Sequence, residues 1–231
     1  MAKSRARAQA LVMAGDVLAD GRPVMKAGTM VNVDSELSVT EAPKFVGRGG
    51  IKLEYALEKY HLDVTGMIAA DIGASTGGFT DCLLQRGADR VYAIDVGYGQ
   101  LDYRLRRDPR VVVMERVNAR YAVDIPEKVD IVVMDVSFIS VEKVLPATTS
   151  LLKTDGSIVV LLKPQFEAKR SEVGKGGIIR SPAVHARVLG RFVAWAVAHR
   201  FRLRGLTASP IPGASGNREF LVLLRKADDS V

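Results

Sequence analysis

The sequence predicts an α/β protein built on a doubly wound, mostly parallel sheet of the Rossmann-like kind. Short apolar runs alternate with helical stretches through most of the chain, a glycine-rich turn follows the first of these runs, and the last two runs are separated by only a short connection. Alternation of buried strands with helices implies right-handed βαβ units, which place helices on both faces of one sheet.

The apolar runs are short, rich in β-branched residues and bounded by polar residues or glycine, as buried parallel strands are. We expect parallel strands at residues 67–71, 91–95, 111–115, 129–135 and 157–162. Helices are expected at residues 78–86, 140–152 and 182–199. The final strands, 203–209 and 219–224, are too close for a crossover helix and should form an antiparallel hairpin at one end of the sheet.

The amino-terminal part differs in character. Residues 4–15 predict a short basic helix closed by a glycine, and residues 17–24 predict two short strands about a turn. So short a segment cannot bury a large core of its own. We expect a small amino-terminal unit over residues 1–42, a linker over 43–50 and the main domain over 51–231.

The charge balance favours a polyanionic partner. The formal net charge is +7, and the stretch from Lys163 to Arg204 holds ten Lys or Arg against two acids. A positive surface attracts phosphates before any specific contact is made. A generic solubilising charge is the alternative.

Other function classes find little support in the composition. Cys82 is the single cysteine, which excludes a disulfide framework and a multi-thiolate metal site and suits a reducing cytoplasm. The three histidines lack metal-ligand spacing. No apolar run approaches the roughly 20 residues of a membrane-spanning helix. We expect a cytoplasmic protein with no metal and no membrane insertion.

A glycine-rich loop marks a candidate ligand site. The expected first strand runs into the segment Asp71-Ile-Gly-Ala-Ser-Thr-Gly-Gly-Phe-Thr80. Its three glycines let the backbone turn tightly and come close to a ligand at the start of the following helix. Ligands of open α/β sheets lie beyond the carboxyl ends of the strands, where this loop falls. Ordinary strand-to-helix packing is the alternative reason for the glycines.

Polar residues near the loop favour a nucleoside ligand. Asp95 ends the second strand, where a carboxylate can accept the hydroxyl groups of a ribose, and Asn118 follows the third strand. The loop lacks the Gly-x-Gly-x-x-Gly spacing of nicotinamide sites, and Asp71 would not help to bind a pyrophosphate. A cationic sulfonium such as S-adenosylmethionine would tolerate Asp71. A helix cap at Asp71 and a solvated strand end at Asp95 are the structural alternatives.

Methyl transfer from a sulfonium to a ribose hydroxyl requires in-line positioning and removal of a proton. A lysine serves as the base only where desolvation or a nearby cation lowers its pKa from about 10.4. Four residues at sheet ends form a matching set: Lys52, Asp135, Lys163 and Glu219. Two lysines close together would depress each other's pKa, and the two carboxylates would orient them. Taken singly, a surface ion pair is the better interpretation of each.

The acceptor of the methyl group is expected to be an oxygen. The segment from Asp135 to Phe138 lacks the prolines of an amino-nitrogen methyltransferase, and no Pro-Cys pair supports cytosine C5 chemistry.

Five segments of the chain resemble the hemolysin-type TlyA family of ribosomal RNA 2'-O-methyltransferases, which share a catalytic domain with FtsJ-like enzymes. The resemblance extends from about residue 4 to residue 224. The segments are Arg48-Gly-Gly-Ile-Lys52-Leu, Asp71-Ile-Gly-Ala-Ser-Thr-Gly-Gly-Phe-Thr80, Met134-Asp-Val-Ser-Phe-Ile139, Leu162-Lys-Pro-Gln-Phe166 and Gly216-Asn-Arg-Glu-Phe220.

The resemblance implies specific roles. The family's Lys-Asp-Lys-Glu tetrad falls on Lys52, Asp135, Lys163 and Glu219, with Lys163 as the base. It also implies S-adenosylmethionine as the cofactor and the ribose of a cytidine in small- or large-subunit ribosomal RNA as the acceptor. The expected cofactor contacts are Asp71, Gly73, Ser75, Thr76, Gly77, Gly78, Phe79, Asp95 and Asn118.

The resemblance further implies an S4-type RNA-binding segment at the amino terminus. Residues 4–39 are similar to the latter part of that domain, whose opening helix would precede Ser4, so we expect a shortened segment or a natural start further upstream. A mobile basic loop over residues 167–180 is expected to close over RNA. The candidate phosphate contacts are Arg5, Arg7, Arg22, Lys26, Lys169, Arg170 and Lys175. A solvated basic face is the alternative for all of them.

Two other functions compete with this interpretation. The family's historical name suggests a membrane-active hemolysin, which requires an amphipathic or spanning segment that the sequence does not show convincingly. A non-catalytic RNA-binding protein on a degraded methyltransferase fold is the second, and the intact tetrad and glycine loop argue against it.

Overall fold

The computed structural model describes residues 5, 8, 9, 12, 17–24, 26, 28–39 and 43–227. The chain divides into two compact units, Met1–Lys44 and Phe45–Val231. The division falls inside the segment 43–50 that was expected to be a linker. Phe45 is buried in the core of the second unit, and helix α2 begins at Gly49. Most of this segment is therefore part of the larger unit.

The amino-terminal unit contains a small antiparallel sheet in the order β2-β1-β3. Its strands are β1 (Val17–Ala19), β2 (Arg22–Pro23) and β3 (Leu37–Val39). Asp20 and Gly21 have positive φ angles of 49° and 75°, which form the turn expected between the first two strands. Strand β3 was not anticipated from the sequence. The helix expected at residues 4–15 lies largely outside the described residues.

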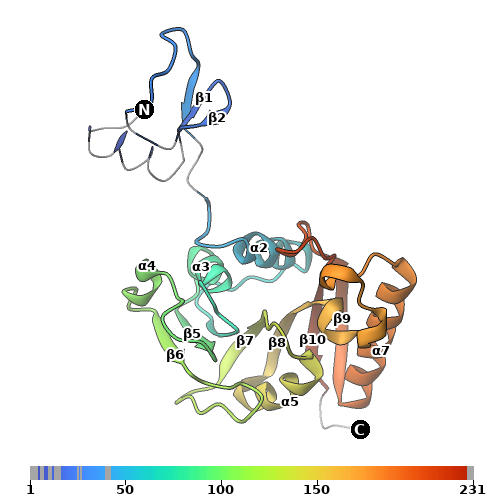
Figure 1. The fold of residues 1–231 in the computed structure, drawn as a ribbon. Coiled ribbons are helices and arrows are strands. Elements are labelled where there is room, and N and C mark those ends of the chain that lie inside the picture. Colours follow the sequence, from blue (N-terminus) through green and yellow to red (C-terminus); the bar gives the residue numbers. More distant parts are fainter. Residues whose placement is uncertain are drawn as a thin grey trace. The chain divides into compact units, whose positions relative to one another are not determined.

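The larger unit is built on a seven-stranded sheet in the order β6-β5-β4-β7-β8-β10-β9 (Figure 1). Its strands are β4 (Ile68–Ile72), β5 (Arg90–Asp95), β6 (Val111–Glu115), β7 (Val129–Met134), β8 (Leu152–Leu162), β9 (Phe201–Ala208) and β10 (Phe220–Lys226). Strands β4 to β8 pair in parallel, whereas β10 is antiparallel to both of its neighbours, β8 and β9. The predicted α/β fold with a carboxyl-terminal antiparallel hairpin is confirmed.

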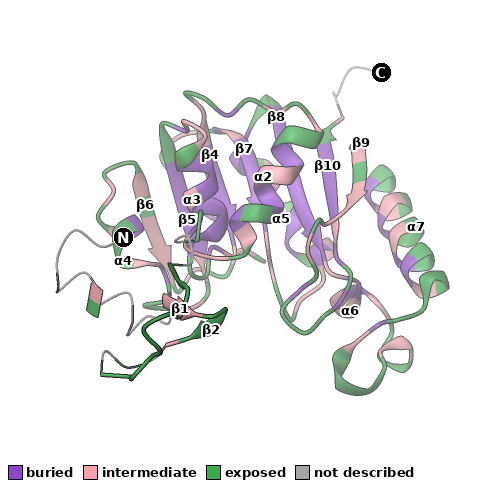
Figure 2. Ribbon diagram, turned by 90° about the horizontal axis from the view of Figure 1, so that it is seen from above, coloured by how far each residue is buried: buried purple, intermediate pink, exposed green. Residues whose placement is uncertain are grey.

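Helices cover both faces of this sheet and bury its strands between them (Figure 2). The helical elements are α2 (Gly49–Lys59), α3 (Gly78–Gln85), α4 (Tyr103–Arg106), η1 (Val141–Lys143), α5 (Leu145–Thr148), η2 (Thr149–Leu151), α6 (Pro164–Glu167), η3 (Arg170–Glu172), η4 (Lys175–Gly177) and α7 (Pro182–Ala198). Side chains of α2, α3 and α4 form one core with one face of the strands. Those of α5 and α7 form the second core with the opposite face.

The helix expected at residues 140–152 is replaced by three short turns, η1, α5 and η2, and β8 begins at Leu152 rather than Ser157. Pro146 lies in the first turn of α5, which begins at Leu145, and cannot continue a helix from before it. The hydroxyl groups of Thr148, Thr149 and Ser150 each donate to the carbonyl three residues earlier. Such local bonds compete with the helical pattern, which explains why the apolar spacing here was misleading.

Candidate active site

Two adjoining pockets open at the carboxyl ends of the parallel strands. One, here called the lysine pocket, has a volume of about 260 Å³ and is lined by Lys52 and Lys163 among others. The other, the Asp95 pocket, has a volume of about 340 Å³. Residues that line both pockets are Gly73, Ser75, Asp135 and Ser137. A ligand in one pocket would therefore lie beside a ligand in the other.

The lysine pocket contains a buried ion pair between two elements far apart in the chain. Lys52 Nζ, on α2, donates to Glu219 Oε2, just before β10, at 2.6 Å. The two side chains are 8% and 3% exposed. Desolvating two charged side chains is costly unless each is closely paired, and the short contact supplies that pairing.

A second ion pair lies in the same pocket. Lys163 Nζ is 2.6 Å from Asp135 Oδ1 and donates to Ser137 Oγ at 2.7 Å. The same ammonium lies 5.9 Å from the centre of the Phe166 ring. Two oxygens on one segment therefore fix the direction of the Lys163 amine. Ser137 was missed from the sequence, although it stands two residues after Asp135.

Sheet pairing explains why these four side chains meet. Strands β7 and β8 are parallel neighbours, so Asp135 and Lys163, which follow them, emerge at one edge. Strand β10 runs antiparallel to β8, and Phe220 pairs with Leu162. Glu219 therefore lies beside Lys163 in the register. The four residues predicted to form the tetrad all line the lysine pocket.

The glycine loop leaves no room for side chains at two positions. Gly73 has φ +84°, and a Cβ there would lie 2.7 Å from the carbonyl oxygen of Asp135. Gly77 has φ +97°, and a Cβ there would lie 2.2 Å from Leu105 Cδ1. Both angles fall in the region that favours glycine. The loop can thus pack against the end of β7 and against α4 while its backbone borders both pockets.

The Asp95 pocket has the character of a nucleoside site. Ile94, Val117, Ile139 and Val144 give it apolar walls, and Asp95, Gln100 and Asn118 give it polar groups. Asp95 accepts the Ser75 N–H at 2.8 Å and the Gly97 N–H at 2.6 Å, which fixes the carboxylate in place. Apolar walls suit a flat base, and a fixed carboxylate suits ribose hydroxyls. The residues present fit the nucleoside part of S-adenosylmethionine.

The other predicted cofactor contacts are divided between the pockets and the interior. Thr76, Gly78 and Phe79 line the lysine pocket, whereas Asp71 and Gly77 line neither. Asp71 is fully buried and accepts the Thr80 hydroxyl at 2.7 Å. Burial raises the pKa of Asp71 to about 7. In this structure Asp71 holds the start of α3 beneath the loop.

A buried carboxylate supports the segment that carries Asp135 and Ser137. Glu167, on α6, is 6% exposed and accepts the Ser140 hydroxyl at 2.6 Å and the Val141 N–H at 2.8 Å. Burial raises the pKa of this carboxyl above its usual value. Sequence analysis missed Glu167, because a single acid in a basic stretch carries no distinctive signal.

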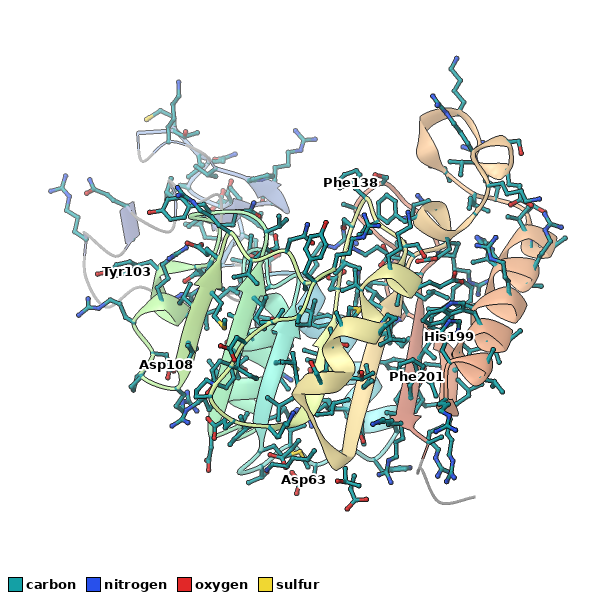
Figure 3. The ribbon with its side chains drawn as sticks, turned by 90° about the horizontal axis from the view of Figure 1, so that it is seen from below. Asp63, Tyr103, Asp108, Phe138, His199 and Phe201 are labelled. Atoms are coloured by element: carbon teal, nitrogen blue, oxygen red, sulfur yellow. The ribbon has the colours of Figure 1, made fainter. Side chains whose placement is uncertain are left out.

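The candidate phosphate contacts that the structure describes are exposed. Arg170 lines a third pocket with Phe138, whose ring is 91% exposed and is labelled in Figure 3. Lys169 and Lys175 are exposed in the segment between α6 and α7. In the amino-terminal unit the described contacts are exposed as well, and Arg7 lies outside the described residues. The described ones are Arg5, Arg22 and Lys26.

Comparisons with known proteins identify the family of the chain. The sequence model of the FtsJ-like methyltransferases matches residues 45–226. The 16S/23S rRNA (cytidine-2'-O)-methyltransferase TlyA of Mycobacterium tuberculosis is 46% identical, over 99% of this chain and 87% of the relative. Hemolysin A of Brachyspira hyodysenteriae is 42% identical, over 95% of this chain and 92% of the relative.

A solved structure is similar as well. A protein from Streptococcus thermophilus described as a hemolysin aligns with a TM-score of 0.80 and 45% identity, over 98% of this chain and 84% of that one. The family model covers residues 45–226, and the Mycobacterium tuberculosis relative and the solved structure cover almost the whole sequence. The chain therefore belongs to the FtsJ-like methyltransferases and, within them, to the TlyA family.

Proposed function

We propose that this protein transfers a methyl group from S-adenosylmethionine to the 2'-hydroxyl of a cytidine in ribosomal RNA. The observation that carries the proposal is the Lys163 amine, held by Asp135 and Ser137 beside the residues shared by the two pockets. The relative from Mycobacterium tuberculosis is named for this reaction.

The Asp95 pocket is the proposed cofactor site. S-adenosylmethionine supplies a cationic sulfonium whose methyl group is open to attack by an oxygen. Asp95 and Asn118 would accept and orient the ribose of the cofactor, and Gly73 and Ser75 would border it where the pockets meet. The closely packed glycine loop leaves the backbone free to approach the ligand.

The lysine pocket is the proposed acceptor site. In its neutral form, the Lys163 amine would take the proton of the ribose hydroxyl as the oxygen bonds to the methyl carbon and the bond from that carbon to sulfur breaks, and Asp135 would balance the ammonium that results. The Lys52–Glu219 pair lines the same pocket and presents fixed charges to the acceptor ribose. Fixed charges need no reorganisation during the reaction, so they favour the transition state.

The proposed RNA surface is basic. The exposed Lys169, Arg170 and Lys175 would contact phosphates near the acceptor site. The amino-terminal unit would act as an S4-like RNA-binding segment through Arg5, Arg7, Arg22 and Lys26. Ribosomal subunits in the cytoplasm are the proposed partner. In the part of the chain that the structure describes, no helix has the length and apolarity needed to cross a bilayer.

The test compares two lysines at opposite ends of β8. Lys163→Ala removes the proposed base, whereas Lys153→Ala removes a lysine that is likewise paired with an aspartate, Asp130, at 2.7 Å. Ribosomal subunits are incubated with each protein and labelled cofactor, and the label is mapped. We expect ribose labelling by the wild type and by Lys153→Ala, and a loss on the order of a hundredfold or more for Lys163→Ala.

Cofactor affinity, measured by calorimetry, should be the same in all three proteins. Equal loss of cofactor binding and transfer in Lys163→Ala would show that Lys163 is not the base. Absence of ribose label from the wild type with every subunit, together with lysis of membranes, would favour a hemolysin over a methyltransferase.

A further inference from the structure

Asn217 is a buried side chain that the proposed chemistry does not use. It is 2% exposed and stands two residues before Glu219. Its Oδ1 accepts the Ile179 N–H at 3.0 Å, and its Nδ2 donates to the Gly177 carbonyl at 2.9 Å. Both ends of the amide are therefore bonded to the backbone of the segment between α6 and α7. A buried amide with partners at both ends fixes the position of what it holds.

The segment that Asn217 holds is the basic loop, defined here as residues 168–180. Its turn contains Gly176 and Gly177 in succession at φ angles of 76° and 75°, and Gly174 N–H donates to the Ile178 carbonyl at 3.2 Å. The exposed Lys175 lies at this turn. Two successive glycines with positive φ have many alternative conformations, so bonds from outside the turn are needed to select one.

The start of the basic loop and its glycine turn differ in how their charged side chains are paired. Glu172 pairs with Arg187 on α7 and accepts the Lys169 N–H, which fixes the start of the loop. Within the described residues no carboxylate pairs with Lys175. In Figure 3 the segment between α6 and α7 protrudes on the same side as Phe138. Among the described residues, Lys175 is thus a cation without a carboxylate partner, at the start of the turn Lys175–Gly177.

The other side of Asn217 packs against the tetrad. Its carbonyl accepts the Gly213 N–H at 2.9 Å. A Cβ on Gly213 would lie 2.3 Å from Glu219 Oε1, so the backbone of the turn packs closely against that carboxylate. Ala214 and Glu219 line the lysine pocket. One residue therefore joins the basic loop to the wall of the proposed acceptor site.

We propose that Asn217 is a positioning residue that locks the basic loop to the wall of the lysine pocket, so that Lys175 meets an RNA phosphate at a fixed place relative to Lys163. The inference rests on the proposed function, because it assumes an RNA acceptor. Lysine is a point charge on a flexible stem, so its contribution to registering the RNA depends on the backbone that carries it.

A double-mutant cycle tests the coupling through kcat/KM for ribosomal subunits. We expect Lys175→Ala to lower kcat/KM a few-fold, as for the loss of one phosphate contact. Asn217→Ala should lower it on the order of tenfold while the cofactor affinity stays unchanged. In the Asn217→Ala background, Lys175→Ala should have no further effect, because the loop no longer presents the lysine. Independent effects of the two substitutions would overturn the proposal.

Matched variants separate coupling from misfolding. Lys226→Ala removes a lysine at the far end of β10 and should change kcat/KM equally little in both backgrounds. Asn217→Asp keeps the acceptor for Ile179 N–H but sets a carboxylate oxygen against the Gly177 carbonyl. We expect it to lower kcat/KM for subunits as Asn217→Ala does, and thermal unfolding should show that both variants remain folded at the assay temperature.

Limited trypsin digestion tests the anchor without any methyl transfer. We expect cleavage after Lys169, Arg170 and Lys175 to be on the order of tenfold faster in both Asn217 variants, and unchanged in Lys226→Ala. Unchanged cleavage in the Asn217 variants would overturn the inference even where transfer is normal. Faster cleavage of the Asn217 variants, combined with a wild type that transfers no methyl group, would overturn the proposed function. It would still support the role of Asn217 in holding the basic loop.

Discussion

Asp71 is the residue whose protonation is most strongly altered by the fold. Burial raises its pKa from 3.8 to about 7, and its one hydrogen-bond donor among the described residues is Thr80. Between these two pH values the folded protein holds a proton that the unfolded chain has released. The free energy of unfolding therefore falls as the pH rises from about 4 to about 7 and levels off above it.

Asp71→Asn should remove this pH dependence, because the amide cannot ionise and still accepts the Thr80 hydroxyl. The free energy of unfolding of the variant, relative to that of the wild type, should rise by about 1.4 kcal/mol for each unit of increasing pH across the window. Urea unfolding at pH 5, 6, 7 and 8 measures this. The control is Asp155→Asn, at an exposed aspartate, whose free energy of unfolding should change with pH as that of the wild type does. Parallel curves for Asp71→Asn would contradict the prediction.

Individual residues differ in how far the sequence could predict them. The four proposed tetrad residues could be named because each stands at a strand or helix position that topology brings to one edge. Ser137 and Asn217 could not, since serine and asparagine are common in turns and their partners lie in separate segments. The glycine-loop motif placed Asp71 among the predicted cofactor contacts. In the structure its side chain is buried and does not line the pockets.

At the scale of elements, the contact between α2 and β10 sets the geometry of the proposed acceptor site. Tyr60, directly after α2, donates its hydroxyl to the Leu221 carbonyl at 2.7 Å, and Lys52 pairs with Glu219 from the same two segments. A Cβ on Gly205 of β9 would lie 2.3 Å from the Tyr60 ring. The aromatic ring is thus clamped between the helix and the hairpin.

Tyr60→Phe should lower the free energy of unfolding by about 1 kcal/mol. The Leu221 carbonyl loses its donor, and water reaches that carbonyl poorly. Burial also raises the pKa of Tyr60 to about 12, so the phenol remains a donor at any ordinary pH. Urea denaturation at pH 7 measures the change. The exposed Tyr121 is the control, and Tyr121→Phe should be neutral. Equal effects of the two substitutions would show that the Tyr60 bond stabilises nothing.

The strands β4 to β7 and the helices α3 and α7 were closely predicted. The runs that form β4 to β7 are continuous and β-branched, and their expected bounds differ from the observed ones by a residue at most at either end. Apolar spacing predicted a helix at residues 140–152, but it contains no information about hydroxyl groups that bond to nearby carbonyls. The short α4 escaped prediction because four residues give no periodicity.

At the scale of the molecule, the boundary between the two units falls between Lys44 and Phe45. A chain that starts at Pro43 should unfold cooperatively and bind the cofactor, because it keeps the whole buried core. One that starts at Ile51, after the expected linker, loses Phe45 and the Arg48 bond to the Pro212 carbonyl. We expect it to be less stable by about 3 kcal/mol or more, the cost typical of a deleted core aromatic.

Thermal unfolding and cofactor titration of the two shortened chains measure this difference, with the full chain as the control. Equal midpoints would show that Phe45 contributes little to the core. A chain from Pro43 that fails to bind the cofactor would show that the first unit is needed for the Asp95 pocket.

Strand β10 follows every other described strand in the chain yet lies inside the sheet, between β8 and β9. During synthesis the lysine of α2 emerges long before its carboxylate partner, because the two residues stand 167 positions apart in the chain. A nascent chain, or one clipped by a protease ahead of Glu219, has neither the fourth member of the tetrad nor a neutralised Lys52. The emergence of Glu219 must therefore precede the formation of the proposed catalytic arrangement.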